Sequence, residues 1–268
     1  MIKSITIGQY YPTDSIIHRI DPRVKLAASF GFIIMLFVIN SFFGYALAAT
    51  LTLAVMLFSK VPPLYALRGL RAIILIIAFT TVLNVFFTPG ETELFQIFGA
   101  TVTQEGVFMA ARTATRLILL IIGSSMLTLT TTSIELTEAI EFSLKPFKKI
   151  GVPAHEIAMM MTIALRFIPT LTEEMDKIMK AQASRGADFD TGGLIKKAKA
   201  LVPVLVPLFI SAFRRADELA TAMESRCYRG DVGRTKMKQT RLSRRDYAAI
   251  ALGFASAAGL YGTNFIRL

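Results

Sequence analysis

DKIMKAQASRG at residues 176–186 and DELATAMESRC at residues 217–227 are two versions of one phrase. Arg185 in the first copy aligns with Arg226 in the second, 41 residues later, and an aspartate, an alanine and a serine align with them. A single Ser-Arg pair carries almost no information, but a duplicate with shared flanking residues does. Two equivalent arginines predict two similar binding sites on soluble partner proteins.

The composition of the rest of the chain is that of an integral membrane protein. Its 268 residues are 53% hydrophobic, with a mean hydropathy of +0.54, more than a soluble domain usually carries. The net charge of +11 lies in segments between apolar runs, which is typical of cytoplasmic loops rather than of a nucleic-acid-binding module. One cysteine excludes an internal disulfide, and the first 25 residues hold no apolar signal-peptide core.

No Asp, Glu, Lys, Arg or His occurs between Lys25 and Lys60. That run of 34 residues is too long for one comfortable span and suits two short ones, because about 20 apolar residues cross a bilayer core. Asn40, Ser41 and Gly44 are expected to form the turn between them. Basic residues flank both ends of the run, so both ends are predicted to lie inside the cell.

A third span is predicted at residues 72–87 and a fourth at residues 107–129, joined by an acidic loop without lysine or arginine. Basic loops are retained inside during insertion, so this loop is assigned outside. Arg112 and Arg116 lie near the outer end of the fourth span. They either extend to the outer surface, which we favour, or are buried against a partner.

Residues 130–245 contain no uncharged stretch of the roughly 18 residues that a spanning helix needs. This region is predicted to be cytoplasmic or to lie along the membrane surface. Thr132 and Glu135 give a capping-type start to one helix, which Pro146 closes.

Two longer helices follow in the same region, at residues 154–184 and 194–225. Gly186 ends the first, and Pro203 and Pro207 are expected to kink the second.

The last apolar segment, residues 247–266, follows a basic flank and fits one more span, which leaves the C-terminus outside. The sequence therefore predicts an all-α integral membrane protein with about five transmembrane helices and a cytoplasmic N-terminus. Its expected parts are an N-terminal transmembrane region (1–129), a cytoplasmic or interfacial coupling domain of long amphipathic helices (130–245) and a C-terminal transmembrane helix (246–268).

The two long helices are amphipathic. Apolar residues recur every three or four positions along residues 157–178, and the same face ends at Arg185. A similar line follows residues 205–223 and ends at Arg226. Such a helix binds a groove through its apolar face, while a guanidinium at its end can bind a carboxylate or backbone carbonyls. The many methionines suit a docking surface or an ordinary packing core equally.

No catalytic arrangement is apparent. GDVGRTK at residues 230–236 lacks the spacing of a phosphate-binding loop, and no metal cluster or nucleophile-base pair is found. His18 and His155 lie far apart in sequence and are interpreted as structural or solvated. We expect no catalytic residue, metal or cofactor, so that any ATP would be bound by another chain.

Three segments resemble the transmembrane T component (EcfT family) of energy-coupling factor (ECF) ABC transporters, and the resemblance covers essentially the whole chain. They are HRIDPRVKL (18–26), ASRGADF (183–189) and ESRCYRG (224–230). Cys227 stands where the family pattern often has glycine, which leaves open whether both long helices end alike. The resemblance implies a multi-pass protein of a prokaryotic plasma membrane.

The resemblance also implies a non-catalytic subunit that joins two ABC ATPases to a membrane-embedded substrate-binding S component, for uptake of a vitamin or related micronutrient. It assigns ATPase docking to Ser184, Arg185, Gly186, Ser225, Arg226 and Cys227. The surface for the S component, or for helix packing, is expected at Met160, Met161, Leu165, Ile168, Leu171, Met175, Leu205, Leu208 and Met223. The lipid bilayer is the remaining partner, and no nucleic acid is expected.

Two other functions stay open at this point. A stand-alone secondary transporter or channel would use Arg112 and Arg116 as intramembrane charges, although the predicted spans hold no acidic residue for ion coupling. A membrane scaffold with a cytosolic docking domain would need only the amphipathic helices.

Overall fold

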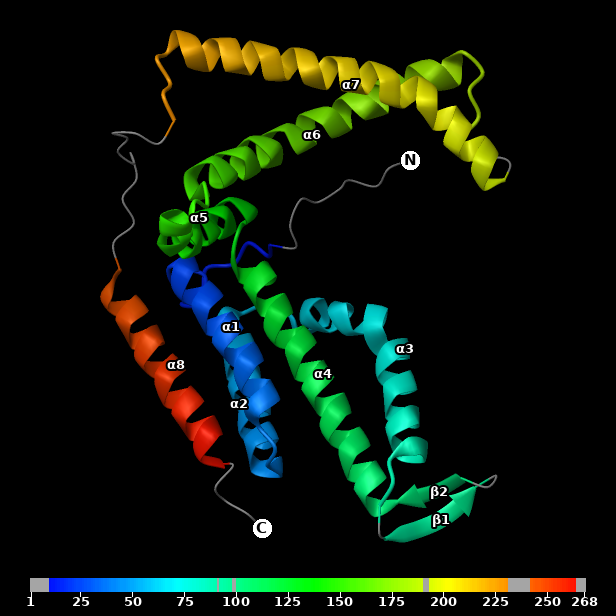
Figure 1. Ribbon diagram of the computed structural model, residues 1–268, viewed down its shortest axis with the longest axis vertical. Coiled ribbons are helices and arrows are strands. Elements are labelled where there is room, and N and C mark those ends of the chain that lie inside the picture. The colour runs from blue at the N-terminus through cyan, green and yellow to red at the C-terminus, as the bar shows by residue number, and fades with distance from the viewer. Residues whose placement is uncertain (1–9, 91, 98–99, 190–192, 231–241, 264–268) are drawn as a thin grey trace. The chain divides into compact units, whose positions relative to one another are not determined.

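The computed structural model describes residues 10–90, 92–97, 100–189, 193–230 and 242–263, and most of them are helical (Figure 1). The chain divides into two compact units. We call residues 8–139 with 239–268 the apolar unit, and residues 1–7 with 140–238 the arginine unit. The protein is an all-α membrane protein, and the domain boundaries expected from the sequence stay predictions.

The apolar unit contains α1 (Pro22–Val38), α2 (Phe42–Ser59), α3 (Pro63–Phe87), α4 (Gln104–Thr130) and α8 (Arg244–Gly262). In Figure 1, α4 lies between α3 and the pair α1 and α2, and it packs against all three. Helix α8 packs against α1 and α2. The larger buried cluster joins four of these helices through Leu36, Ile39, Tyr45, Ala48, Leu119 and Leu260.

The outer surface of the apolar unit is hydrophobic, as contact with lipid requires. Leu75 on α3 is 76% exposed, and Phe42 at the start of α2 is 82% exposed. Among the described residues, α2 and α4 are long and apolar enough to span a membrane. Helix α3 is a third candidate if its two parts, Pro63–Arg71 and Ile73–Phe87, which are bent by 61°, form one span. The count of five spans stays a prediction.

The predicted turn between the first two spans is correct for Asn40 and Ser41 but wrong for Gly44. Gly44 lies in the first turn of α2. A Cβ at that position would overlap the side chains of Ile39 and Thr263, so glycine is needed there for close packing rather than for a turn. Sequence cannot separate these two uses of glycine.

The loop predicted at residues 88–104 contains a short antiparallel hairpin, β1 (Glu93–Ile97) and β2 (Ala100–Thr103). This hairpin was not predicted, because its strands are too short for an alternating pattern to be visible in the sequence. Thr103 then caps α4, since its hydroxyl accepts a hydrogen bond from the Gly106 N–H at 3.1 Å.

The preference for a surface-reaching Arg116 was wrong. Its Nη2 donates to the Tyr45 hydroxyl at 2.7 Å, and its Nε donates to the same oxygen at 3.0 Å. The Tyr45 hydroxyl in turn donates to the Ile39 carbonyl, at 3.1 Å, at the end of α1. The guanidinium therefore binds the turn between α1 and α2, while Arg112 is exposed.

Both histidines make local contacts. The His18 ring lies 2.7 Å from the Ser15 hydroxyl and 3.1 Å from the Tyr11 carbonyl, and burial lowers its pKa, which favours the neutral ring. His155 lies 3.4 Å from a carboxylate oxygen of Glu141. These contacts support the structural interpretation of both residues.

The arginine unit contains the last part of α5 (Ser133–Leu144), from Ile140 onward, the 3-10 helix η1 (Lys145–Ile150), α6 (Ala154–Ser184) and α7 (Leu194–Ser225). The capping start of α5 is confirmed, because Thr132 and Glu135 each accept a hydrogen bond from the other's backbone N–H. Helices α6 and α7 have the predicted bounds. Hydrophobic periodicity and the terminating glycines were sufficient to place them.

The segment HRIDPRVKL joins three parts of the apolar unit through buried polar contacts. Lys25 is 8% exposed, and its Nζ donates to the His18 carbonyl at 3.0 Å and to the Thr130 carbonyl, at the end of α4, at 2.9 Å. The Asp21 N–H donates to the Asp246 carboxylate at the start of α8, at 2.8 Å. The segment therefore ties α1 to α4 and α8.

We expect Lys25→Met to lower the stability of the protein by about 2–4 kcal/mol, because two buried carbonyls lose their donor. Thermal unfolding of the purified chain in detergent measures this. The control is Arg19→Met, which removes an exposed ion pair with Asp14 and should change stability by less than about 1 kcal/mol. Equal losses in both variants would contradict a joining role for Lys25.

Candidate functional site

The candidate site consists of the two ends of α6 and α7 that carry Arg185 and Arg226, together with the contact that holds these helices. The helices cross in Figure 1 and run in opposite directions. Gln182, near the end of α6, donates to the Pro203 carbonyl near the start of α7, at 3.5 Å. The Tyr228 hydroxyl, beyond the end of α7, donates to Met159 Sδ near the start of α6, at 3.1 Å.

Three polar residues occupy the middle of the α6–α7 contact. Arg215 Nη2 on α7 donates to Glu174 Oε2 on α6 at 2.9 Å, and the Ser211 hydroxyl donates to the other carboxylate oxygen. The Ser211 bond, together with Arg215, lowers the pKa of Glu174 although burial acts in the opposite direction. Glu174 is therefore ionised at neutral pH, and the stability this pair contributes is lost only as the pH falls through that lowered pKa.

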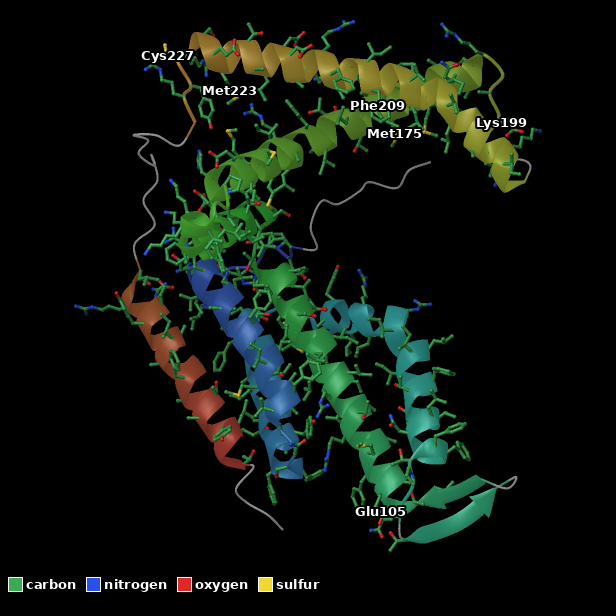
Figure 2. All side chains as sticks on the ribbon, in the orientation of Figure 1. Glu105, Met175, Lys199, Phe209, Met223 and Cys227 are labelled. Atoms are coloured by element: carbon green, nitrogen blue, oxygen red, sulfur yellow. The ribbon has the colours of Figure 1, made fainter. Side chains whose placement is uncertain are left out.

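Helix α7 bends in its first part, where Figure 2 labels Lys199. The predicted kink has a clear cause, because Pro207 has no N–H to donate to the carbonyl of Pro203, four residues earlier. Gln182 supplies a hydrogen bond to that same carbonyl from the last turn of α6. The end of one helix is thus linked to the bend of the other.

Both helices end in the same way. Arg185 has φ −91° and ψ 8°, and Arg226 has φ −92° and ψ 15°. The next residue is left-handed in each case, with φ +87° at Gly186 and φ +57° at Cys227. The backbone bonds of a Schellman motif follow at both ends: Ala187 N–H to the Gln182 carbonyl and Tyr228 N–H to the Met223 carbonyl, each 3.0 Å.

These bonds answer the question raised by Cys227. A cysteine in the glycine position does not change the shape of the helix end, although its Cβ makes the left-handed backbone less favourable. The two arginines are therefore presented on the same local backbone. Figure 2 shows Cys227 at the end of α7, beyond Met223.

All six residues predicted for ATPase docking are exposed in the structure. The Ser184 and Ser225 hydroxyls donate to carbonyls of their own helices, each at 3.0 Å, so these serines complete the helix ends. Arg185 and Arg226 are exposed, so their guanidinium groups are accessible to a partner. The docking role itself stays a prediction.

The predicted packing surface is divided in the structure. Met161, Leu165, Leu171, Met175, Leu208 and Met223 are half-buried, whereas Met160, Ile168 and Leu205 are exposed. In Figure 2, Met175 and Phe209 mark the stretch where α6 and α7 cross. Of the nine predicted residues, six are therefore partly buried and three are exposed.

Helix α7 has an exposed apolar face that was not predicted. It consists of Val202, Val206, Phe209, Ile210 and Phe213, which are 53–68% exposed. We call these five residues the α7 apolar face. Their spacing of three or four was visible in the sequence, but the stripe leading to Arg226 was chosen instead. A face of this width on one helix is a mark of an interaction surface.

Within the described residues no group of three or more His, Cys, Asp or Glu side chains could hold a metal ion. The expected lack of cofactor and catalytic residues stays a prediction. What the site offers chemically is recognition: two guanidinium groups for acceptors in partners and an apolar face for an apolar partner.

We expect Gly186→Ala and Cys227→Gly to have opposite effects on the two helix ends. A Cβ at Gly186 would meet no atom within 4 Å, so alanine costs about 1 kcal/mol through the left-handed backbone alone. Glycine at position 227 removes that cost. Hydrogen exchange of residues 178–189 and 219–230 measures the change, with Gly193→Ala, at φ −69° at the start of α7, as a control that should leave both segments unchanged. Effects of equal sign would contradict the common ending.

The comparisons with known proteins identify the family of this chain. A family model described as cobalt transport protein (CbiQ) matches residues 13–238. The chain is 60% identical over 250 residues to an energy-coupling factor transporter transmembrane protein EcfT of Clostridium kluyveri, covering 93% of each chain. It is 53% identical over 265 residues to the protein of that name from Thermosediminibacter oceani, covering 99% of this chain and 100% of the relative. The protein therefore belongs to the CbiQ family of cobalt transport proteins, as a transmembrane component of the energy-coupling factor type.

Proposed function

We propose that this chain is the coupling subunit of an ATP-driven ECF importer. Two ABC ATPase subunits bind the helix ends at Arg185 and Arg226, and a membrane-embedded S component that carries a vitamin or related micronutrient binds the apolar surfaces. The names of the relatives place them in energy-coupling factor transporters. The observation that carries the proposal is the pair of exposed arginines on two helix ends of the same geometry.

The equal helix ends suit two similar partners. An arginine that follows a fixed Schellman turn leaves from a defined backbone, so less conformational freedom is lost when its guanidinium binds a carboxylate or backbone carbonyls. When the ATPases close on ATP, they move the two ends. Helices α6 and α7 are continuous from these ends to their crossing, so they transmit the movement.

The α7 apolar face is the part of the arginine unit that best suits an S component. A partner embedded in lipid presents apolar side chains, and Phe209 and Phe213 are 61% and 68% exposed. The transported substrate bound by that partner would not contact this chain's arginines. ATP hydrolysis belongs to the partner ATPases, so this subunit is not an enzyme.

The contacts of Arg116 argue against a stand-alone channel. Arg116, one of the two intramembrane charges it would use, is bound to Tyr45 and to the end of α1. The membrane location follows from the family and from the apolar helices. We propose further that the N-terminus is cytoplasmic and the C-terminus outside, because basic residues flank the inner helix ends.

Replacing both arginines, Arg185→Glu with Arg226→Glu, should abolish co-purification of the ATPases while membrane insertion is unchanged. Each single change should weaken binding roughly 30-fold or more, because a buried arginine contact of this kind typically contributes about 2 kcal/mol. Lys180→Glu and Arg229→Glu are controls, since both residues are exposed cations near the helix ends. Full ATPase recovery with the double variant would refute the docking proposal.

Cys227 tests the orientation directly, because it is the only cysteine and is exposed. A membrane-impermeant maleimide should label it in inverted vesicles, should not label it in intact cells, and should react more slowly when the ATPases are bound. The opposite control is Thr92→Cys in a Cys227→Ser background, which should react in intact cells. Labelling of Cys227 from outside would exclude the proposed orientation.

A further inference from the structure

The 41-residue offset between the two arginines extends over the whole of α6 and α7. Shifted by this offset, the helix at residues 154–184 falls on residues 195–225, and α7 runs from Leu194 to Ser225. Glu174 then falls on Arg215. In the structure these two equivalent residues bind each other, with Arg215 Nη2 2.9 Å from Glu174 Oε2.

A contact between a residue and its own equivalent has a geometric meaning. At an isologous interface such a contact lies on the twofold axis, and by analogy we place an approximate axis of the α6–α7 pair between Glu174 and Arg215. Arg185 and Arg226 each lie 11 residues further along their helices, in opposite directions. At 1.5 Å per residue each is about 16 Å from the axis, so the two arginines are roughly 30 Å apart.

An acid and a base, Glu174 and Arg215, are suited to a position on the axis. Two identical charged residues would repel each other there, but the chain has an acid in one copy and a base in the other. The surrounding polar contacts are also unequal, because Ser211 occupies one oxygen of Glu174. An attractive pair on the axis holds both helices without favouring either end.

The pair is not fully bonded. Arg215 binds Glu174 through Nη2, while its Nε is buried and finds no acceptor in the described part of the chain. If a small rotation of the helices withdrew Ser211, Nε could bind the oxygen that Ser211 leaves, which would give the two-bond fork that arginine and carboxylate favour. The crossing therefore has a second bonded arrangement available.

We propose that Glu174 and Arg215 form the fulcrum about which α6 and α7 rotate, so that the two arginine ends move together and remain equally spaced from this pair. The part of this proposal that concerns movement rests on the proposed function. The part that concerns the distance between the two helix ends rests on the structure alone. These are positioning residues. Ion pairs as exposed as this one, with side chains 24% and 38% exposed, contribute little to stability, so their effect is expected in geometry.

The distance between the helix ends tests the spacing without any partner. Nitroxide labels are placed on the native Cys227 and on Ala183→Cys in the full chain in nanodiscs, and the distance is measured by pulsed electron resonance. The expected distribution is narrow and centred at roughly 30 Å. Glu174→Gln and Arg215→Met should each broaden it at least twofold, and the exchange Glu174→Arg with Arg215→Glu should restore it.

The chain supplies matched controls. Glu173 and Arg214 are adjacent to the pair, have the same chemistry and the same 41-residue offset, and are both exposed. Glu173→Gln and Arg214→Met should leave the distribution unchanged, and thermal unfolding should be the same in all variants. Unchanged distances in Glu174→Gln and Arg215→Met, or equal broadening in the controls, would overturn the proposal.

A second measurement tests rotation in the complex with the two ATPases. ATP with vanadate, which holds ABC ATPases closed, should shift the distance by several ångströms in the wild-type chain and leave it broad in the single variants. No shift in the wild-type complex would overturn the fulcrum. If the chain with Arg185→Glu and Arg226→Glu still bound the ATPases, the proposed docking would fail, while the distances in the isolated chain would still decide the spacing.

Discussion

The packing of α6 against α7 decides where the two arginines of this protein lie. Each arginine ends a helix of more than 30 residues, and the bonds from Arg215 and Ser211 to Glu174 hold the two helices at their crossing. Hydrogen bonds at Gln182 and Tyr228 hold the flanks of the same contact. The geometry of recognition therefore depends on one helix pair, and other elements of the arginine unit serve to connect it.

The charged side chains discussed above have different surroundings in the two units. In the apolar unit the charged groups Lys25 and Arg116 are engaged by carbonyls and a tyrosine, as required where water is scarce. In the arginine unit the important charges at Arg185 and Arg226 are exposed. The protein therefore satisfies these charges internally in the apolar unit and leaves the two arginines exposed in the arginine unit.

The comparisons show the family, and the structure shows the helix ends. The relatives share the transporter name over nearly the full length of this chain. The structure shows that Cys227, at the position where the sequence resemblance predicts glycine, still allows the Schellman bonds to form. It also shows the α7 apolar face, on a side of the helix that the arginine stripe did not indicate.

The sequence by itself determined the bounds of α6 and α7, the repeated arginine phrase, the cap of α5 and the membrane class, because periodicity, capping residues and hydropathy are local properties. It could not determine that Gly44 serves helix packing, that Arg116 binds Tyr45, or that Glu174 meets Arg215. Each of these depends on residues brought together from different helices. Only the tertiary structure fixes such distances, since the 41-residue offset gives two equivalent arginines but neither the shape of the helix ends nor the contact between Glu174 and Arg215.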